Sequence, residues 1–159
     1  MKLQLKEWQS RLLLGVVHRY FAVARGMTLG VRGACFDKDG RIFLVRHSYV
    51  PGWHMPGGGV ERGETVGQAL EKELREEGNL RMLEPPQLIH VYFNSAASAR
   101  DHVVFYKVLV EQTAPRPADL EIVECGFFAL DALPENLSPA TQRRLVELED
   151  ETVAKADRW

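Results

Sequence analysis

Three consecutive glycines at residues 57–59 lead directly into a stretch that is rich in glutamate. Residues 65–78 are predicted to form a helix, with Thr65 as its N-cap and either Gly78 or Asn79 in the left-handed conformation that ends it. Leu70 and Leu74 give this helix an apolar stripe that attaches it to a core. Because glycine has no Cβ, the backbone of residues 57–59 can approach a ligand closely, which a merely solvated helix would not require. The chain is therefore predicted to hold a glycine loop next to a core-packed helix.

The predicted helix carries Glu73, Glu76 and Glu77 on one face. A rotation of about 100° per residue places Glu73 and Glu77 nearly in line, with Glu76 roughly 60° to the other side of Glu73. Neighbouring carboxylates repel one another, and a hard divalent cation that takes oxygen ligands removes that penalty. The alternative is a solvated face on which Lys72 and Arg75 neutralise the glutamates.

The order of elements predicts a single mixed α/β domain over residues 1–159. Apolar residues three and four positions apart predict a helix over about residues 5–24, ended by Gly26. Ser138 followed by Pro139 predicts the start of a last helix. The predicted strands cover residues 28–36, 41–46, 87–94, 102–111 and 123–130.

Charge and composition exclude several classes of protein. The formal net charge of −2 argues against a general nucleic-acid binder, which needs a basic surface. The apolar run at residues 12–17 is far shorter than the roughly 20 residues that span a bilayer. Cys35 and Cys125 show no metal-binding spacing and fit free thiols in a reducing cytoplasm, with a disulfide between them left open. We therefore expect a cytoplasmic protein with no membrane span and no nucleic-acid polymer as partner.

Residues 58–80 resemble the sequence box of the Nudix hydrolase family. That pattern is Gly, five residues, Glu, seven residues, and then Arg-Glu-apolar-x-Glu-Glu-x-Gly-apolar. Here Gly58 and Glu64 begin the pattern, and residues 72–80 complete it with every acidic position and both spacings matched. A motif this long with fixed spacings is unlikely to arise by chance.

Two positions depart from the family pattern. Lys72 replaces the arginine, keeping its charge but losing the planar fork that pairs with a carboxylate. Asn79 replaces a glycine and still tolerates the left-handed conformation that ends a helix. The resemblance covers roughly residues 28–148 and implies an α/β/α sandwich around a mixed β-sheet, to which the N-terminal helix is an addition.

By resemblance, the protein hydrolyses a diphosphate attached to another group, often a nucleoside, with Mg²⁺ or alternatively Mn²⁺ as cofactor. The resemblance assigns the metal to Glu73, Glu76 and Glu77, and the catalytic roles to Glu64, Glu73 and Glu76. In this assignment Glu64 braces the loop through Lys72 rather than touching the metal. The general base stays open between a box glutamate and an acid from the segment before the last strand. The acids in that segment are Asp119, Glu121 and Glu124.

Substrate binding is predicted at Arg46, Gly58 and Trp53. The Arg46 guanidinium can hold a phosphate bidentately or form a surface ion pair, and the Gly58 carbonyl is also a candidate metal contact. Trp53 and Tyr92 can stack on a base or belong to the core. His47 lies in the same loop and is predicted to be solvated.

The sequence does not name the substrate. The family's markers downstream of the box, a proline for ADP-ribose hydrolases and a tyrosine for diadenosine polyphosphate hydrolases, are absent, since Ala96 and Ala97 occupy the corresponding region. A catalytically silent Nudix-fold module that senses a nucleotide is the alternative function, although such modules usually lose box carboxylates. The N-terminal helix can dock on a membrane surface, cover its own sheet or pair with a second copy in a homodimer; its single Glu7 and few cations favour packing on protein.

Overall fold

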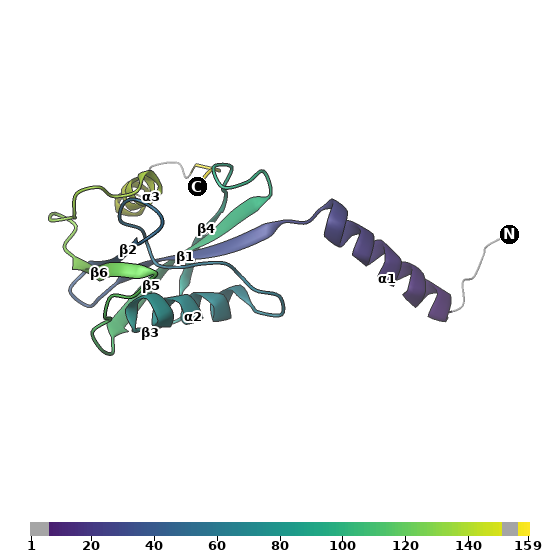
Figure 1. Ribbon diagram of the computed structural model, residues 1–159, viewed down its shortest axis with the longest axis horizontal. Helices are drawn as coiled ribbons and strands as arrows, with labels where there is room; N and C mark the ends of the chain where they lie inside the picture. The colour runs from purple at the N-terminus through teal and green to yellow at the C-terminus, as the bar shows by residue number, and fades with distance from the viewer. Residues whose placement is uncertain (1–6, 151–155) are drawn as a thin grey trace.

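The computed structural model describes residues 7–150 and 156–159, and the side chains of the first helix from Leu14 onward. Figure 1 shows a central sheet with a helix on each face and one further helix at the N-terminal end. In chain order the elements are α1 (Glu7–Ala24), β1 (Thr28–Phe36), β2 (Ile42–His47), α2 (Val66–Gly78), β3 (Leu80–Met82), β4 (Gln87–Phe93), β5 (Asp101–Gln112), β6 (Ile122–Phe128) and α3 (Pro139–Glu149).

The six strands form one mixed sheet in the order β3-β5-β1-β2-β6, with β4 also paired to β5. β1 and β5 run parallel, and the other named strand pairs are antiparallel. The long β5 pairs with β3 near Val110 and with β4 near Lys107, so these two short strands share one neighbour.

Two hydrophobic cores lie on opposite faces of this sheet. Under α2, Leu70 and Leu74 pack with residues of β1, β2, β5 and β6; under α3, Leu145 packs with a second set. In β2, Phe43 and Val45 point to the first core while Ile42 and Leu44 point to the second. All four are buried because a central strand of a covered sheet has no solvent face. The predicted α/β/α sandwich is confirmed.

Both predicted ends of α2 are confirmed. The Thr65 hydroxyl accepts a hydrogen bond from the Gln68 N–H at 3.2 Å, and the Gln68 side chain accepts one from the Thr65 N–H at 2.9 Å. This reciprocal capping satisfies two backbone donors that the helix leaves free. Asn79 adopts the left-handed conformation, with φ of 51°, and ends the helix in place of the family's glycine.

The segment that contains the glycines lies between β1 and β2 and pairs with both. His54 and Val45 exchange backbone hydrogen bonds of 2.9 and 2.8 Å on the β2 side. On the β1 side, the Val31 N–H donates to the Gly58 carbonyl at 2.8 Å, and Gly33 donates to Pro56 at 2.9 Å. The glycine loop is therefore held by the sheet, directly above the start of α2.

Some boundaries differ from the prediction. β1 matches its predicted range, whereas β2 ends at His47, one residue beyond the predicted strand. β3 was not predicted, because a strand of three residues offers too few positions for a recognisable alternation. Cys35 and Cys125 are free, with Cys35 buried and Cys125 only partly buried.

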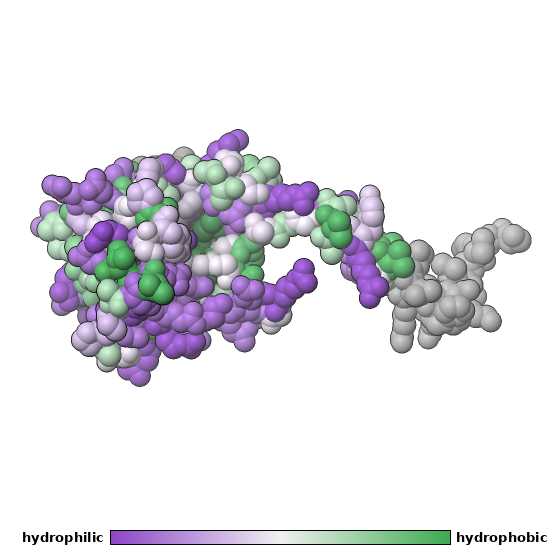
Figure 2. Space-filling view, viewed as in Figure 1, coloured by the Kyte–Doolittle hydropathy of each residue, from purple (hydrophilic) through white to green (hydrophobic). Residues whose placement is uncertain are grey.

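Helix α1 extends away from the sheet (Figure 1). Its described apolar side chains are exposed, and Figure 2 shows them as separate green areas on the projecting helix. The exposed set includes Leu14, Val16, Tyr20 and Val23. Of the three alternatives left open for this helix, covering its own sheet does not fit the described residues. Trp8, Leu12 and Leu13 of the predicted stripe lie outside the described side chains. No helix in the described part of the chain has the length and apolar character needed to cross a membrane.

Candidate active site

Two of the three glycines are required by close contacts. At Gly57, with φ of 142°, a Cβ would lie 2.0 Å from the carbonyl oxygen of Val31. At Gly58 a Cβ would lie 2.3 Å from Glu73 Oε1, whereas Gly59 has open space around it. The first two glycines thus allow the loop to pass between β1 and the Glu73 carboxylate.

Glu77 is the most buried of the three predicted metal ligands. Its Oε2 accepts a hydrogen bond from the Gly57 N–H at 2.8 Å, which ties the end of α2 to the glycine loop. Burial raises the pKa of Glu77 to about 7. The Arg32 guanidinium and the Gly57 N–H oppose this shift, while the carboxylates of Glu73 and Glu121 add to it. A buried carboxylate with so high a pKa is ready to exchange its proton for a cation.

Glu73 lies one helical turn before Glu77 in α2, and Glu76 is the residue that directly precedes Glu77. Burial raises the pKa of Glu73, and the neighbouring carboxylates of Glu76 and Glu121 reinforce the shift. The side chain of Glu76 is 57% exposed and lies 3.8 Å from the Arg75 guanidinium. Glu76 is thus the predicted site residue that is most open to solvent.

The predicted brace between Glu64 and Lys72 is present in the structure. Lys72 Nζ lies 3.4 Å from Glu64 Oε1, and the Glu61 N–H donates to Glu64 Oε2 at 2.9 Å. The Glu61 N–H and the Lys72 ammonium together lower the pKa of Glu64. Glu64 is therefore held as a carboxylate that fixes the turn before α2.

A histidine and two glutamates converge beside the buried end of α2. One ligand atom from each of His47, Glu77 and Glu121 lies within 4.8 Å of the other two. His47 is 6% exposed, so the expectation of a solvated side chain is wrong. Its position follows from the extra residue of β2 and from the segment after it, which folds back over the strand end.

Of the three acids before the last strand, only Glu121 joins this group. Asp119 accepts the backbone N–H groups of Glu121 and Ile122 and pairs with Arg116 at 2.7 Å. Glu124 is paired with Arg46 across β2 and β6. Sequence reasoning named all three acids as candidate bases, and the strand register is what separates them.

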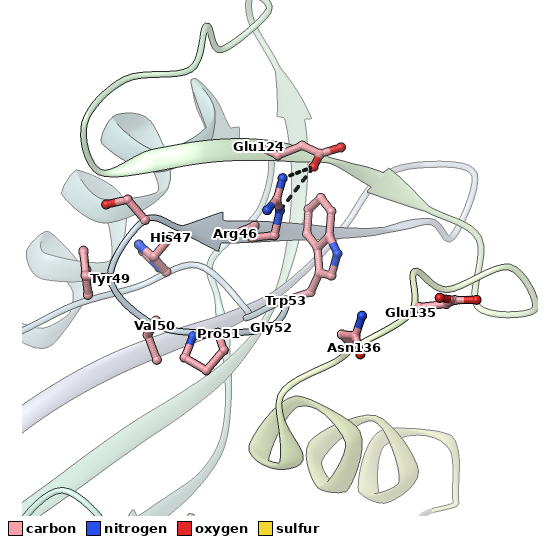
Figure 3. A pocket seen from close by; sticks show the side chains of 11 residues that line it. Arg46, His47, Tyr49, Val50, Pro51, Gly52, Trp53, Glu124, Glu135 and Asn136 are labelled. Atoms are coloured by element: carbon pink, nitrogen blue, oxygen red, sulfur yellow. Dashed lines mark hydrogen bonds and ion pairs between the residues drawn. The ribbon is translucent and has the colours of Figure 1, made fainter.

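A cavity of about 770 Å³ opens beside His47 (Figure 3). Arg46 and Trp53, both predicted for substrate binding, line it together with Tyr49. The Arg46 guanidinium is 2.8 Å from the Glu124 carboxylate, the ion pair that the sequence left as an alternative, and its centre is 5.9 Å from the Trp53 ring. The volume falls within the range of small-molecule sites.

Tyr92 does not reach this cavity. Its side chain is fully buried under α3, and its hydroxyl donates a hydrogen bond of 2.6 Å to Glu147. Arg144, also buried, lies 3.8 Å over the Tyr92 ring. Of the two roles left open for Tyr92, the structure shows the core.

Arg32 is a site residue that sequence reasoning missed. Its guanidinium donates to the carbonyl of Met55 at 3.2 Å and to that of Gly57, which fastens the glycine loop to β1. Its positive charge also opposes the rise in the pKa of Glu73 and Glu77. In the sequence it is one charged residue in a strand, which typically faces solvent, and no motif marks it.

The donor set suits a divalent cation. The carboxylates of the buried Glu77 and the partly buried Glu73 both have raised pKa values, so metal binding would relieve both their mutual repulsion and their desolvation. Burial lowers the pKa of His47 to about 4, with the charges of Arg32 and His54 adding to the effect. Its imidazole is therefore neutral near pH 7 and leaves a lone pair available.

Comparison with known proteins gives consistent matches. A family model described as the NUDIX domain matches residues 27–148. The chain is 31% identical over 103 residues to the ADP-ribose pyrophosphatase of Methanocaldococcus jannaschii, covering 62% of this chain and 60% of that protein. It is 30% identical over 96 residues to the 8-oxo-dGDP phosphatase NUDT18 of Mus musculus, covering 60% of this chain and 29% of that protein. The matches thus span less than two thirds of either relative.

The fold is also found among solved structures. The crystal structure of the MutT NUDIX hydrolase from Burkholderia pseudomallei aligns with a TM-score of 0.64 and 29% identity, over 76% of this chain and 97% of that chain. The region that the family model matches, residues 27–148, contains the glycine loop, α2 and the strands that hold them. The chain therefore belongs to the Nudix hydrolase family.

Proposed function

We propose that the protein is a divalent-metal-dependent hydrolase that cleaves a diphosphate linkage in a nucleoside diphosphate derivative or a related nucleotide. The observation that carries the proposal is the pair of carboxylates, the buried Glu77 and the partly buried Glu73, held against the glycine loop beside a cavity of nucleotide size. The names of the two relatives, an ADP-ribose pyrophosphatase and an 8-oxo-dGDP phosphatase, support the same class of substrate.

In this proposal Glu73, Glu76 and Glu77 hold the cation, with Mg²⁺ expected and Mn²⁺ as the alternative, because oxygen ligands suit both. When bound, the cation would neutralise the negative charge of the diphosphate and lower the pKa of the attacking water. Because Gly58 has no side chain, its backbone lies directly against Glu73, and the diphosphate of the substrate would be able to approach the same carboxylate. The Glu64–Lys72 pair fixes the turn from which α2 starts.

Glu76 is proposed to accept the proton of the attacking water as well. Its side chain is far more open to solvent than those of Glu73 and Glu77, so a water molecule reaches it readily. Asp119 and Glu124 are less suited to this role, since each lies within 2.8 Å of an arginine, whereas the Arg75 guanidinium is 3.8 Å from Glu76. A positioned general base of this kind contributes about 10²–10⁴-fold to the rate.

The cavity is proposed to hold the rest of the nucleotide. Arg46 would hold a phosphate, and the exposed ring of Tyr49 offers a stacking surface at the rim. Trp53 is only 7% exposed, and its indole meets the Phe128 ring at 72° with the ring centroids 5.0 Å apart, so it offers little surface for stacking. We propose free nucleotides in the cytoplasm as substrates, in keeping with the near-neutral charge and the two free cysteines.

Hydrolysis of a substrate panel tests this function. The panel contains nucleoside diphosphate sugars such as ADP-ribose, nucleoside diphosphates and triphosphates, and dinucleotides, each with Mg²⁺, Mn²⁺ or EDTA. We expect release of a nucleoside monophosphate or phosphate from one class of substrate, with the metal and not with EDTA.

The same panel distinguishes the hydrolase from the alternative function, a catalytically silent module that only binds a nucleotide. Absence of turnover across the panel, from protein shown by circular dichroism to be folded, would contradict the hydrolase. Binding of a nucleotide under those conditions, seen as a rise in melting temperature, would instead support a silent sensor module.

A further inference from the structure

We infer that His47, together with Glu77 and Glu121, forms a mixed nitrogen–oxygen site for a divalent cation, and that this site makes Mn²⁺, the alternative cation of the proposed function, bind more tightly than Mg²⁺. The inference deepens the proposed function, on whose metal dependence it rests. It adds to the box carboxylates two residues that lie outside the box.

The three residues come from three separate elements that meet at one point. His47 is the last residue of β2, Glu77 lies in the final turn of α2, and Glu121 directly precedes β6. Their ligand atoms all lie within 4.8 Å of one another, and His47 Nε2 is 3.4 Å from Glu77 Oε1. A cation between atoms at these separations can contact all three with small side-chain movements.

Each of the two glutamates is oriented by a neighbour. The Gly57 N–H holds Glu77 Oε2 at 2.8 Å, which leaves Oε1 on the side of His47. The Tyr49 hydroxyl donates to Glu121 Oε1 at 3.3 Å, and the Ser48 N–H donates to the Glu121 carbonyl at 2.9 Å. Ligands held by such outer partners are typical of metal sites.

The imidazole of His47 independently points to a ligand. Its side chain is 96% buried, and its Nδ1 has no hydrogen-bond partner among the described residues. Buried polar nitrogen without a partner is unfavourable and uncommon in folded proteins. A cation coordinated by one ring nitrogen, with a water on the other, would satisfy this ring; a core histidine kept only for packing would not need two carboxylates beside it.

The nitrogen ligand determines the metal preference. Mg²⁺ strongly prefers oxygen donors, whereas first-row transition metals accept imidazole. Replacing His47 should therefore weaken Mn²⁺ binding far more than Mg²⁺ binding. We expect a loss of Mn²⁺ affinity of about tenfold or more, in line with the 10–100-fold cost of disturbing even outer-shell groups.

Electron spin echo spectroscopy of the full-length protein with substoichiometric Mn²⁺ tests the nitrogen ligand directly. The wild-type protein should show a ¹⁴N coupling that changes to a ¹⁵N coupling when its histidines carry ¹⁵N. His54→Gln is the matched control, because its ring is 5.9 Å from that of His47 but lies outside the group. We expect the coupling in His54→Gln and its loss in His47→Gln, with His47→Asn as a second variant if the first does not fold.

Titration calorimetry with Mn²⁺ and Mg²⁺ completes the test without any substrate. Bound Mn²⁺ without nitrogen coupling in the wild-type protein, or an equal loss of affinity for both metals in His47→Gln, would overturn the inference while leaving the metal-dependent hydrolase intact. A His47 side chain that serves only as an ion-pair partner of Glu77 would give that same result. Folded protein that binds neither metal would overturn both the inference and the proposed function.

Discussion

The Glu73 carboxylate lies directly against the backbone of Gly58, where a single added methyl group would come within 2.3 Å of Oε1. This contact joins the glycine loop to the helix that carries the predicted metal ligands. Any side chain at this glycine must displace the carboxylate, because the loop itself is fixed by hydrogen bonds to β1.

Gly58→Ala is therefore expected to reduce kcat/KM by about 100-fold, the effect of misplacing a catalytic group by roughly 1 Å. The fold should survive, because the clashing atoms are the end of a flexible side chain. Steady-state kinetics and thermal melting measure the two effects. Gly59→Ala is the control, since open space surrounds that position; equal activity of the two variants would contradict the proposed role of Glu73.

Glu76→Gln is expected to lower kcat by two to four orders of magnitude, about the contribution of a general base. Stability should change by less than about 0.5 kcal/mol, because the side chain is mostly exposed and its only described ion pair is with Arg75. Stopped assays at saturating metal together with urea unfolding check both values. Retention of activity with normal metal dependence would remove Glu76 from the mechanism.

Metal binding is expected to release a proton below about pH 7. Glu77 has a raised pKa of about 7 and must ionise to bind a cation, so affinity falls as the pH drops through this value. The lowered pKa of His47, about 4, means that its ring contributes no proton near pH 6. Calorimetry at about pH 6 in buffers of different ionisation enthalpy should give close to one proton per metal, and almost none above pH 8. A metal affinity that does not change with pH would contradict the conclusion that Glu77 is protonated at pH 6 in the metal-free protein.

The Arg46–Glu124 pair allows the two roles of Arg46 to be separated. Both side chains are about half exposed, so breaking the pair should cost only about 0.2–1 kcal/mol of folding free energy. If Arg46 holds a phosphate, Arg46→Ala raises KM strongly, while Glu124→Gln frees the guanidinium and leaves KM unchanged or lower. Equal rises in KM for both variants would show that substrate binding depends on the Arg46–Glu124 ion pair and not on a contact between Arg46 and the phosphate.

The exposed apolar side of α1 is expected to be covered by a second copy of the chain. Light scattering should give a molar mass twice that of one chain, reduced to one chain by Val16→Glu combined with Tyr20→Glu. His18→Glu adds a charge on the same helix outside the apolar set and serves as the control. A wild-type protein with the mass of one chain would exclude the homodimer.

Much of the fold and part of the site could be predicted from the sequence, because local rules determine them. The range of β1, the cap at Thr65 and the helix end at Asn79 depend on residues within a few positions of one another. The Glu64–Lys72 brace also follows from one motif. In each case the sequence distance and the spatial distance are both short.

The remainder depends on contacts between distant segments. His47 is buried because the chain folds back between β1 and β2, and Glu121 reaches it through pairing of β2 with β6. Arg32 joins the site only because the glycine loop crosses its strand. No periodicity within a single segment indicates contacts of this kind, so the sequence predicted a solvated His47 and did not mark Arg32 at all.

The insertion of residues 54–60 between β1 and β2 has a consequence for local unfolding. Active-site loops commonly open at little cost, since few backbone hydrogen bonds tie them down. Here the amide groups of Val31, Gly33 and Val45 donate to carbonyls of the loop, so opening the loop must break these bonds, whereas the pairing of β1 with β5 and of β2 with β6 can remain. Hydrogen exchange at these three amides is therefore expected to report the opening of this loop, and to be slower than in a loop that is held only at its two ends.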